Sequence, residues 1–138
     1  MGVAHKGNFL SEGQALATGS GVTLNAASTN IANMQAANIG EGNPVDLVFE
    51  IVEAVVGGVA PTLTIKIESD TVEGMGTKRT ELQTRAYAAA DITKKGRLIK
   101  VGIPSPINKY IGAYYTLVPG AAAITAGKIN AYFERREI

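Results

Sequence analysis

Alternation with a period of two dominates the segment KYIGAYYTLVPGAAAITAGKINAYF, residues 109–133. An extended strand points successive side chains to opposite faces, so alternating large apolar and polar or small residues indicate strands. In the first half of the segment, one face carries Ile111, Ala113, Tyr115 and Leu117. After the Pro119-Gly120 turn, one face of the second half carries Ile129, Ala131 and Phe133. The segment therefore predicts two strands that return on each other as a stiff antiparallel pair.

Similar alternating segments recur along the chain, separated by turn residues. We expect further strands at Val45–Val55, Thr62–Ser69, Lys78–Arg85 and Gly96–Pro104, and a weaker one within residues 21–34. A short helical turn is expected within Thr84–Asp91. Roughly seven or eight short strands without crossover helices predict an all-β fold. Its expected form is an antiparallel β-sandwich of the jelly-roll type, in one domain, with an extended N-terminal arm.

The N-terminal forty residues are too weakly apolar to form core strands throughout. They consist mostly of Ala, Asn, Gly, Ser and Thr, with Phe9, Leu10 and Leu16 as isolated apolar anchors. Two interpretations stay open for residues 1–20, an arm that grasps a neighbour or an ordinary first strand, with the sandwich over residues 21–138. If the segment is an arm, deleting Met1 to Gly13 should leave the sandwich folded.

Reactive side chains are scarce. His5 is the only histidine and there is no cysteine, so neither a zinc site nor a Ser-His-acid triad is expected. Glu68 and Asp70 stand two residues apart on a predicted strand, which would place both on its solvent-facing side. Calcium binding by Glu68, Asp70 and Glu73 lacks a recognisable loop pattern. We therefore expect no enzyme activity, no cofactor and no metal.

Charge and hydropathy exclude further classes of partner. The formal net charge of +1 gives no strong attraction to nucleic acid, and the basic cluster at Lys94–Lys100 fits a turn followed by the polar face of a strand. Nowhere does the chain approach the roughly 20 consecutive apolar residues of a membrane span. Its start also lacks the apolar stretch of a secretion signal. No nucleic acid and no membrane is expected as a partner.

Several segments resemble, in the same order, the capsid cement (decoration) proteins of short-tailed bacteriophages. They are LSEGQALA, AASTNIANM, IGEGNPVDLVFEIVEA, PTLTIKIESD and, above all, GRLIKVGIPSPINKYIGAYYTLVPGAAAITAGKINAYF. The resemblance covers most of the chain from about Leu10 onward and contains no catalytic motif. It implies a small jelly-roll protein, made in the bacterial host cytoplasm, that binds the outer capsid surface and clamps neighbouring major capsid protein subunits. It also implies self-association, as a homodimer or a trimer.

A cement protein needs shared apolar and hydrogen-bonding surface rather than chemistry. The residues that we expect at such interfaces are Phe9, Leu10, Leu16, Tyr110, Tyr114 and Tyr132. The alternative is a non-catalytic carbohydrate-binding jelly-roll module, which would want an exposed aromatic platform. The absence of Trp counts against that alternative. A glycosidase that uses the acid pair near Glu68 ranks last.

Overall fold

The computed structural model describes residues 9–33, 45–72, 74–102 and 110–135. Nearly all of its regular structure is strand. The elements in chain order are β1 (Phe9–Ala15), β2 (Leu24–Ala27), β3 (Ala32–Asn33), β4 (Val45–Gly57), β5 (Thr62–Asp70), β6 (Arg79–Gln83), α1 (Ala89–Ile92), β7 (Gly96–Gly102), β8 (Tyr110–Val118) and β9 (Ile124–Arg135).

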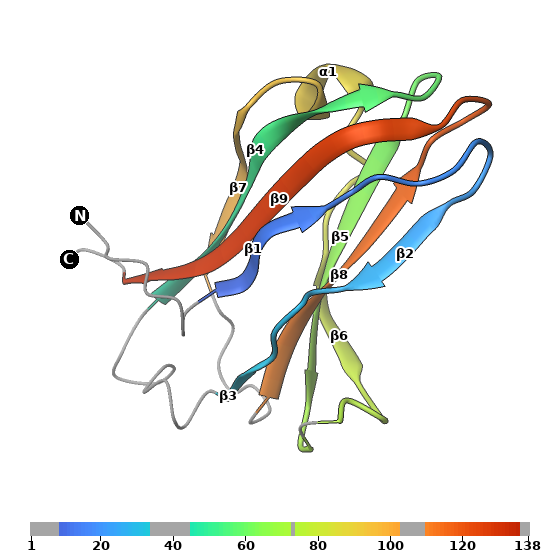
Figure 1. The fold of residues 1–138 in the computed structure, drawn as a ribbon. Coiled ribbons are helices and arrows are strands. Elements are labelled where there is room, and N and C mark those ends of the chain that lie inside the picture. The colour runs from blue at the N-terminus through green and yellow to red at the C-terminus, as the bar shows by residue number, and fades with distance from the viewer. Residues whose placement is uncertain (1–8, 34–44, 73, 103–109, 136–138) are drawn as a thin grey trace.

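The strands form two antiparallel sheets that pack face to face as a sandwich (Figure 1). The first sheet has the order β1-β9-β4-β7 and the second the order β2-β8-β5-β6, with β3 pairing to β8 beside β2. The predicted class, an all-β antiparallel sandwich, is confirmed. The jelly-roll type remains a prediction.

Alternation correctly identified the faces that form the core. The odd-numbered residues of β8 between Ile111 and Leu117 are buried, as are Leu63, Ile65 and Ile67 of β5. Across from them, the first sheet contributes the apolar residues Leu47, Phe49, Ile51, Ile129, Ala131 and Phe133. The rings of Phe49 and Tyr115 meet edge to face between the sheets, with centroids 6.2 Å apart. The core therefore lies between the two inner faces, as in other sandwiches.

The predicted pairing of residues 109–118 with the strand that follows is wrong. β8 pairs with β5 along its whole length, from Thr62 opposite Val118 to Asp70 opposite Tyr110. β9 instead pairs with β4 and β1 in the other sheet. Residues 119–123 thus carry the chain from one sheet to the other. Alternation reports which face of a strand is buried but not which strand lies beside it, and this is why the sequence misled here.

Of the two interpretations left open for residues 1–20, the first strand describes residues 9–15, which form an edge strand of the first sheet. The side chain of Leu10 is fully buried in the core, and so is that of Leu16 just beyond the strand. Ser11 Oγ lies 2.8 Å from the hydroxyl of Tyr115, which joins β1 to the opposite sheet. Deleting Met1 to Gly13 would therefore remove part of the core. Residues 1–8, including His5, lie outside the described residues.

Gln14 joins β1 to the end of β2 and the residues that follow it. Its Oε1 accepts hydrogen bonds from Ser11 Oγ at 2.6 Å and from the backbone nitrogen of Thr29 at 3.0 Å. Its Nε2 donates to the carbonyl of Ala27 at 2.9 Å. These contacts tie the edges of the two sheets together where β1 and β2 face each other.

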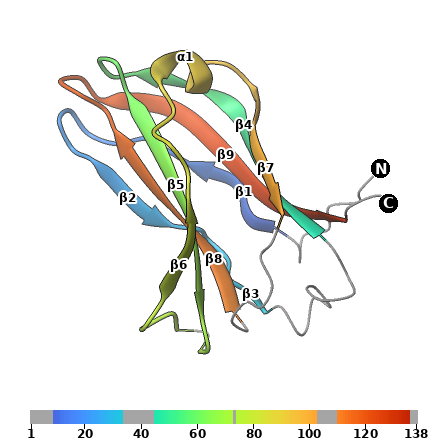
Figure 2. The ribbon, with the colours of Figure 1, turned by 180° about the vertical axis from the view of Figure 1, so that it is seen from behind.

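The short helix expected within Thr84–Asp91 is found slightly later, as α1. Ile92 of α1 is buried in the core. The helix lies between β6 and β7 along the chain (Figure 2). In the part of the chain that the structure describes, no helix is long and apolar enough to cross a membrane.

Candidate functional site

The aromatic residues predicted as contacts fall on two opposite faces of the sandwich. Tyr110 and Tyr114 lie on the outer face of the second sheet. The alternate residues of β8, which are Ile111, Ala113 and Tyr115, point into the core. Tyr132 lies on the outer face of the first sheet, between the buried Ala131 and Phe133. All three tyrosines are half-buried. These expected contact residues therefore lie on two separate surfaces of the molecule.

On the first sheet, Phe9 and Tyr132 form an aromatic pair. Their ring centroids are 5.4 Å apart, with an angle of 44° between the ring planes. The pair arises because Phe9 of β1 stands opposite Tyr132 of β9 in the antiparallel ladder. Burial raises the pKa of the Tyr132 hydroxyl, and the nearby carboxylates of Glu50 and Glu134 raise it further. A tyrosine hydroxyl is protonated at neutral pH even at its ordinary pKa of 10.0, so that of Tyr132 can donate a hydrogen bond to a partner.

Charged side chains flank the aromatic pair. On β7, which is separated from β9 by β4, Lys100 Nζ lies 3.0 Å from Glu134 Oε1 and 3.7 Å from Asp46 Oδ2. The sequence assigned Lys100 to a basic cluster, and the structure shows its charge balanced by two carboxylates. This face is therefore a mixed apolar and ionic surface rather than a basic patch.

On the second sheet, Tyr114 carries a cation over its ring. Lys78 Nζ lies 5.1 Å from the centroid of Tyr114 and 3.6 Å from Glu68 Oε1. Lys78 precedes β6, so the contact reaches across β5 to β8 in the middle of the sheet. An ammonium group over an aromatic face is attracted by the negative charge of the ring, more strongly where water is excluded. A partner that covers this cluster would meet both an aromatic ring and a charge.

Glu68 and Asp70 are not on an open solvated face, contrary to the expectation. Their exposed fractions are only 7% and 3%. The reason is that the segment after β5 folds back over the outer face of the sheet. Met75 reaches Gly112 of β8, where an added Cβ would lie 3.7 Å from its terminal methyl carbon. From strand alternation alone, this cover over the sheet could not be seen.

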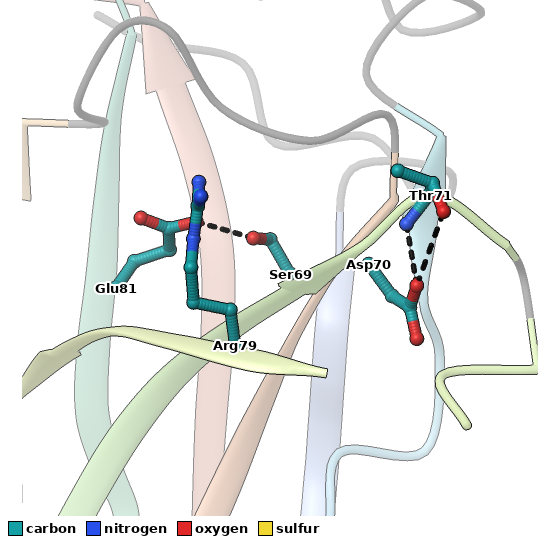
Figure 3. Close-up of polar contacts among 5 residues, drawn as sticks. All are labelled: Ser69, Asp70, Thr71, Arg79 and Glu81. Carbon is teal, nitrogen blue, oxygen red and sulfur yellow. Dashed lines mark hydrogen bonds and ion pairs between the residues drawn. The ribbon is translucent and has the colours of Figure 1, made fainter. Parts of the chain in front are cut away.

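Asp70 holds the β5–β6 turn through hydrogen bonds from backbone N–H groups. Its Oδ1 accepts from Thr71 at 2.6 Å (Figure 3) and from Val72 at 3.4 Å. Its Oδ2 accepts from Thr77 at 2.7 Å. The Thr77 bond, followed by those of Thr71 and Val72, keeps the pKa of Asp70 below its ordinary value although burial opposes this. A carboxylate so engaged closes a turn and is poorly suited to give up a proton as a general acid.

Glu81 makes a second polar cluster beside the first (Figure 3). Its Oε2 accepts a very short hydrogen bond from Ser69 Oγ and lies 2.7 Å from Arg79 Nη2. Burial alone would raise the pKa of Glu81, but the Ser69 hydroxyl and the Arg79 guanidinium outweigh it, so the pKa is lowered. Both clusters serve the hairpin itself.

These carboxylates are not arranged to hold a metal ion. Among the described residues, no three His, Cys, Asp or Glu side chains come together as a possible metal site. Glu73, the third member of the weak calcium pattern, lies outside the described residues. A turn signal was present in the sequence, because an Asp followed by Thr and closely spaced glycines favours a turn closed by its own carboxylate.

The structure changes the status of two predicted contact residues. Leu10 and Leu16 are fully buried in the core of their own chain and are not available to a partner. Phe9, Tyr110, Tyr114 and Tyr132 keep part of their surface exposed, and their role as contacts stays a prediction.

Comparison with known proteins gives one family. The family described as Bbp16 matches residues 10–133 of this chain. No curated protein matches it. Among solved structures, the chain is similar to one described as the crystal structure of infectious bursal disease virus VP2 subviral particle, with 13% identity and a TM-score of 0.23. The likeness covers 94% of this chain but only 40% of that one, and at such a TM-score it carries no argument.

Proposed function

This chain belongs to the Bbp16 family, and from that premise we propose that it is a structural protein of the virion, a cement protein that binds a phage capsid. The stretch that resembles the cement proteins of short-tailed bacteriophages begins near Leu10 and largely coincides with the family match over residues 10–133. In this proposal the protein sits on the outer capsid surface and clamps neighbouring major capsid protein subunits. It performs no catalysis.

The observation that carries the proposal is the presence of half-buried aromatic residues on both outer faces of one rigid sandwich. Phe9 and Tyr132 lie on the first sheet, and Tyr114 lies beneath Lys78 on the second. A clamp must hold two bodies at once, and two opposite contact faces suit that task. Each contact can be weak, because a clip that binds two subunits gains from the high effective concentration of the second site.

The strand order also supports the jelly-roll interpretation. Eight of the strands divide into two sheets of four, β1-β9-β4-β7 and β2-β8-β5-β6, and the chain passes repeatedly from one sheet to the other. Jelly rolls are two-sheet sandwiches of eight strands with this kind of alternation between sheets, and they recur in viral capsid proteins. We interpret the fold in this sense.

Co-sedimentation with empty, expanded shells of the same phage's major capsid protein tests the function. The wild-type chain should pellet with the shells and saturate them. Tyr114→Ala and Tyr132→Ala should each weaken binding by about tenfold, since aromatic residues dominate interface energies. Gln83→Ala, an exposed change on edge strand β6, is the matched control and should bind like the wild type.

Two results would overturn the proposal. The first is a folded wild-type chain that fails to bind shells at any concentration tested. The second is specific binding on a glycan array without any binding to shells, which would favour the carbohydrate-binding alternative.

A further inference from the structure

Three turns from distant parts of the sequence meet at one end of the sandwich. They are the β1–β2 turn at residues 18–22, the β4–β5 turn at residues 57–61 and the β8–β9 turn at residues 118–124. Figures 1 and 2 both show them side by side, at the end opposite the β5–β6 hairpin. We call these residues the three-turn tip.

The three-turn tip and the strand ends that lead into it contain no charged residue. Segments 16–24, 54–65 and 111–127 lack Asp, Glu, Lys, Arg and His entirely. Yet 18% of the whole chain is charged, and both outer faces described above carry ion pairs. An exposed end without charge is unusual in a chain of this composition, because surface turns normally carry charged side chains for solubility.

Large apolar side chains are concentrated at this end. Seven large hydrophobic residues of the described chain are exposed, and four of them belong to the tip or its immediate flanks: Val22, Val56, Val59 and Val118. Val59 and Val22 are 58% and 56% exposed. Single exposed apolar residues need no explanation, but a group of them in a charge-free surface is typical of a binding site.

The tip is held rigid by hydrogen bonds between its turns. The backbone nitrogen of Val59 donates to the carbonyl of Pro119 at 2.8 Å, and that of Gly58 donates to Ala123 at 3.0 Å. Ser20 Oγ donates to the carbonyl of Ala121 at 2.8 Å. A surface fixed in advance loses little conformational entropy when it binds. The exposed valines are therefore presented in a set arrangement.

From these observations we propose that the three-turn tip is an additional contact, which docks on an uncharged apolar surface of the capsid subunit. This inference rests on the proposed cement function. The partner surface must also be uncharged, because a charged group buried against the tip would find no counter-ion there and would lose its hydration.

The size and chemistry of the tip disfavour two other partners, a second copy of this chain and a lipid surface. The exposed large apolar side chains of the tip are Val22, Val59 and Val118, with Val56 beside them. Side chains so small and few favour a minor contact over an interface of roughly 800 Å² per partner that would hold two copies together in solution. A lipid surface is also disfavoured, since the tip has neither the basic residues nor the Trp and Phe typical of interfacial membrane contacts. A small contact of this kind is effective when a second contact already holds the molecule on the same partner.

Lysine substitutions at exposed valines test the inference with the same empty shells. Val59→Lys and Val22→Lys place a charge in the tip, and each should weaken shell binding at least tenfold. The matched control is Val72→Lys, which adds the same charge at a valine that is 53% exposed in the β5–β6 turn, at the other end of the sandwich. This control should bind like the wild type. Thermal melting should confirm that all three variants remain folded.

The outcomes separate the two proposals. If the wild-type chain binds shells and the tip variants bind equally well, the tip is not a contact, while the cement function stands. If the control weakens binding as much as the tip variants do, the effect comes from added charge and the inference is wrong. If the wild-type chain itself does not bind, the cement function fails and the tip inference falls with it.

Discussion

Two glycines permit the close approach of turns at the three-turn tip. Gly57 has a φ of +101°, and a Cβ added there would lie 2.2 Å from the carbonyl oxygen of Ala123. Gly120 has a φ of +75°, and its Cβ would lie 2.3 Å from the carbonyl oxygen of Val59. Both obstacles are backbone atoms that cannot rotate away. At these two positions any side chain would push one turn away from the other.

We therefore expect Gly57→Ala and Gly120→Ala each to reduce the free energy of unfolding by about 1–3 kcal/mol or more, from backbone strain and steric overlap. Chemical denaturation followed by fluorescence or circular dichroism measures this loss. Gly76→Ala is the control, because nothing lies within 4 Å of its added Cβ and its φ is not in the left-handed region. Equal stability of all three variants would show that the turns are not packed as described.

At the scale of elements, the β5–β6 hairpin depends on the ionised carboxylate of Asp70. Hydrogen bonds from backbone N–H groups lower the pKa of this group below its ordinary 3.8. A carboxylate with a depressed folded-state pKa stabilises the fold fully above the unfolded-state value, and this contribution is lost as the pH falls through the lower folded-state pKa. Below that point the turn loses its charged acceptor.

Asp70→Asn should accordingly lower the melting temperature at neutral pH, because the amide keeps only one acceptor oxygen where the carboxylate uses two, one for Thr71 and Val72 and the other for Thr77. The difference between wild type and variant should shrink as the pH falls below the ordinary value of 3.8 and through the lower folded-state pKa, because the wild-type carboxylate then becomes protonated. Thermal melts across this range measure it, and amide exchange at Thr71 and Thr77 should rise in the variant. A difference that stays constant down to the lowest pH would contradict the assigned role.

The sequence predicts which segments form strands better than it predicts which strands pair with each other. The strands at residues 62–69 and 109–117, and the faces they bury, were foreseen because alternation follows directly from strand geometry. The pairing of these strands does not follow from alternation. The expected β8–β9 pair does not form, because β9 lies in a different sheet from β8. Likewise Leu10 looked isolated among small residues, but an edge strand needs only one or two large side chains to reach the core. The burial of Asp70 depended on a fold-back that only the three-dimensional structure shows.

At the scale of the whole molecule, each sheet ends, within the residues that the structure describes, in strands that pair on one side only. At one end of the sheets these strands are β7 and β6, whereas β1 and β2 at the other end are already joined by the hydrogen bonds of Gln14 and by the bond from the backbone nitrogen of Asn30 to the carbonyl of Leu10. An open edge offers backbone groups to a strand of another copy. Together with the half-buried tyrosines, such edges support the prediction that the protein self-associates as a dimer or a trimer.

Sedimentation velocity over a wide concentration range should show a species larger than the 14.4 kDa monomer. Raising the salt concentration should change the association only modestly, because the net charge of +1 leaves little electrostatic energy to screen. A strict monomer at the highest concentration would contradict self-association in solution.

The antiparallel neighbours β1 and β9 also determine how the molecule would respond to a pulling force. Phe9 at the start of β1 stands opposite Tyr132 near the end of β9, so both strands have their outer ends at the same place. A load applied across these two ends would break the β1–β9 hydrogen bonds one after another, as a zipper opens, rather than all at once in shear. The β1–β9 pairing should therefore break at low force, and β1 should separate first while the remainder of the sandwich bears the load.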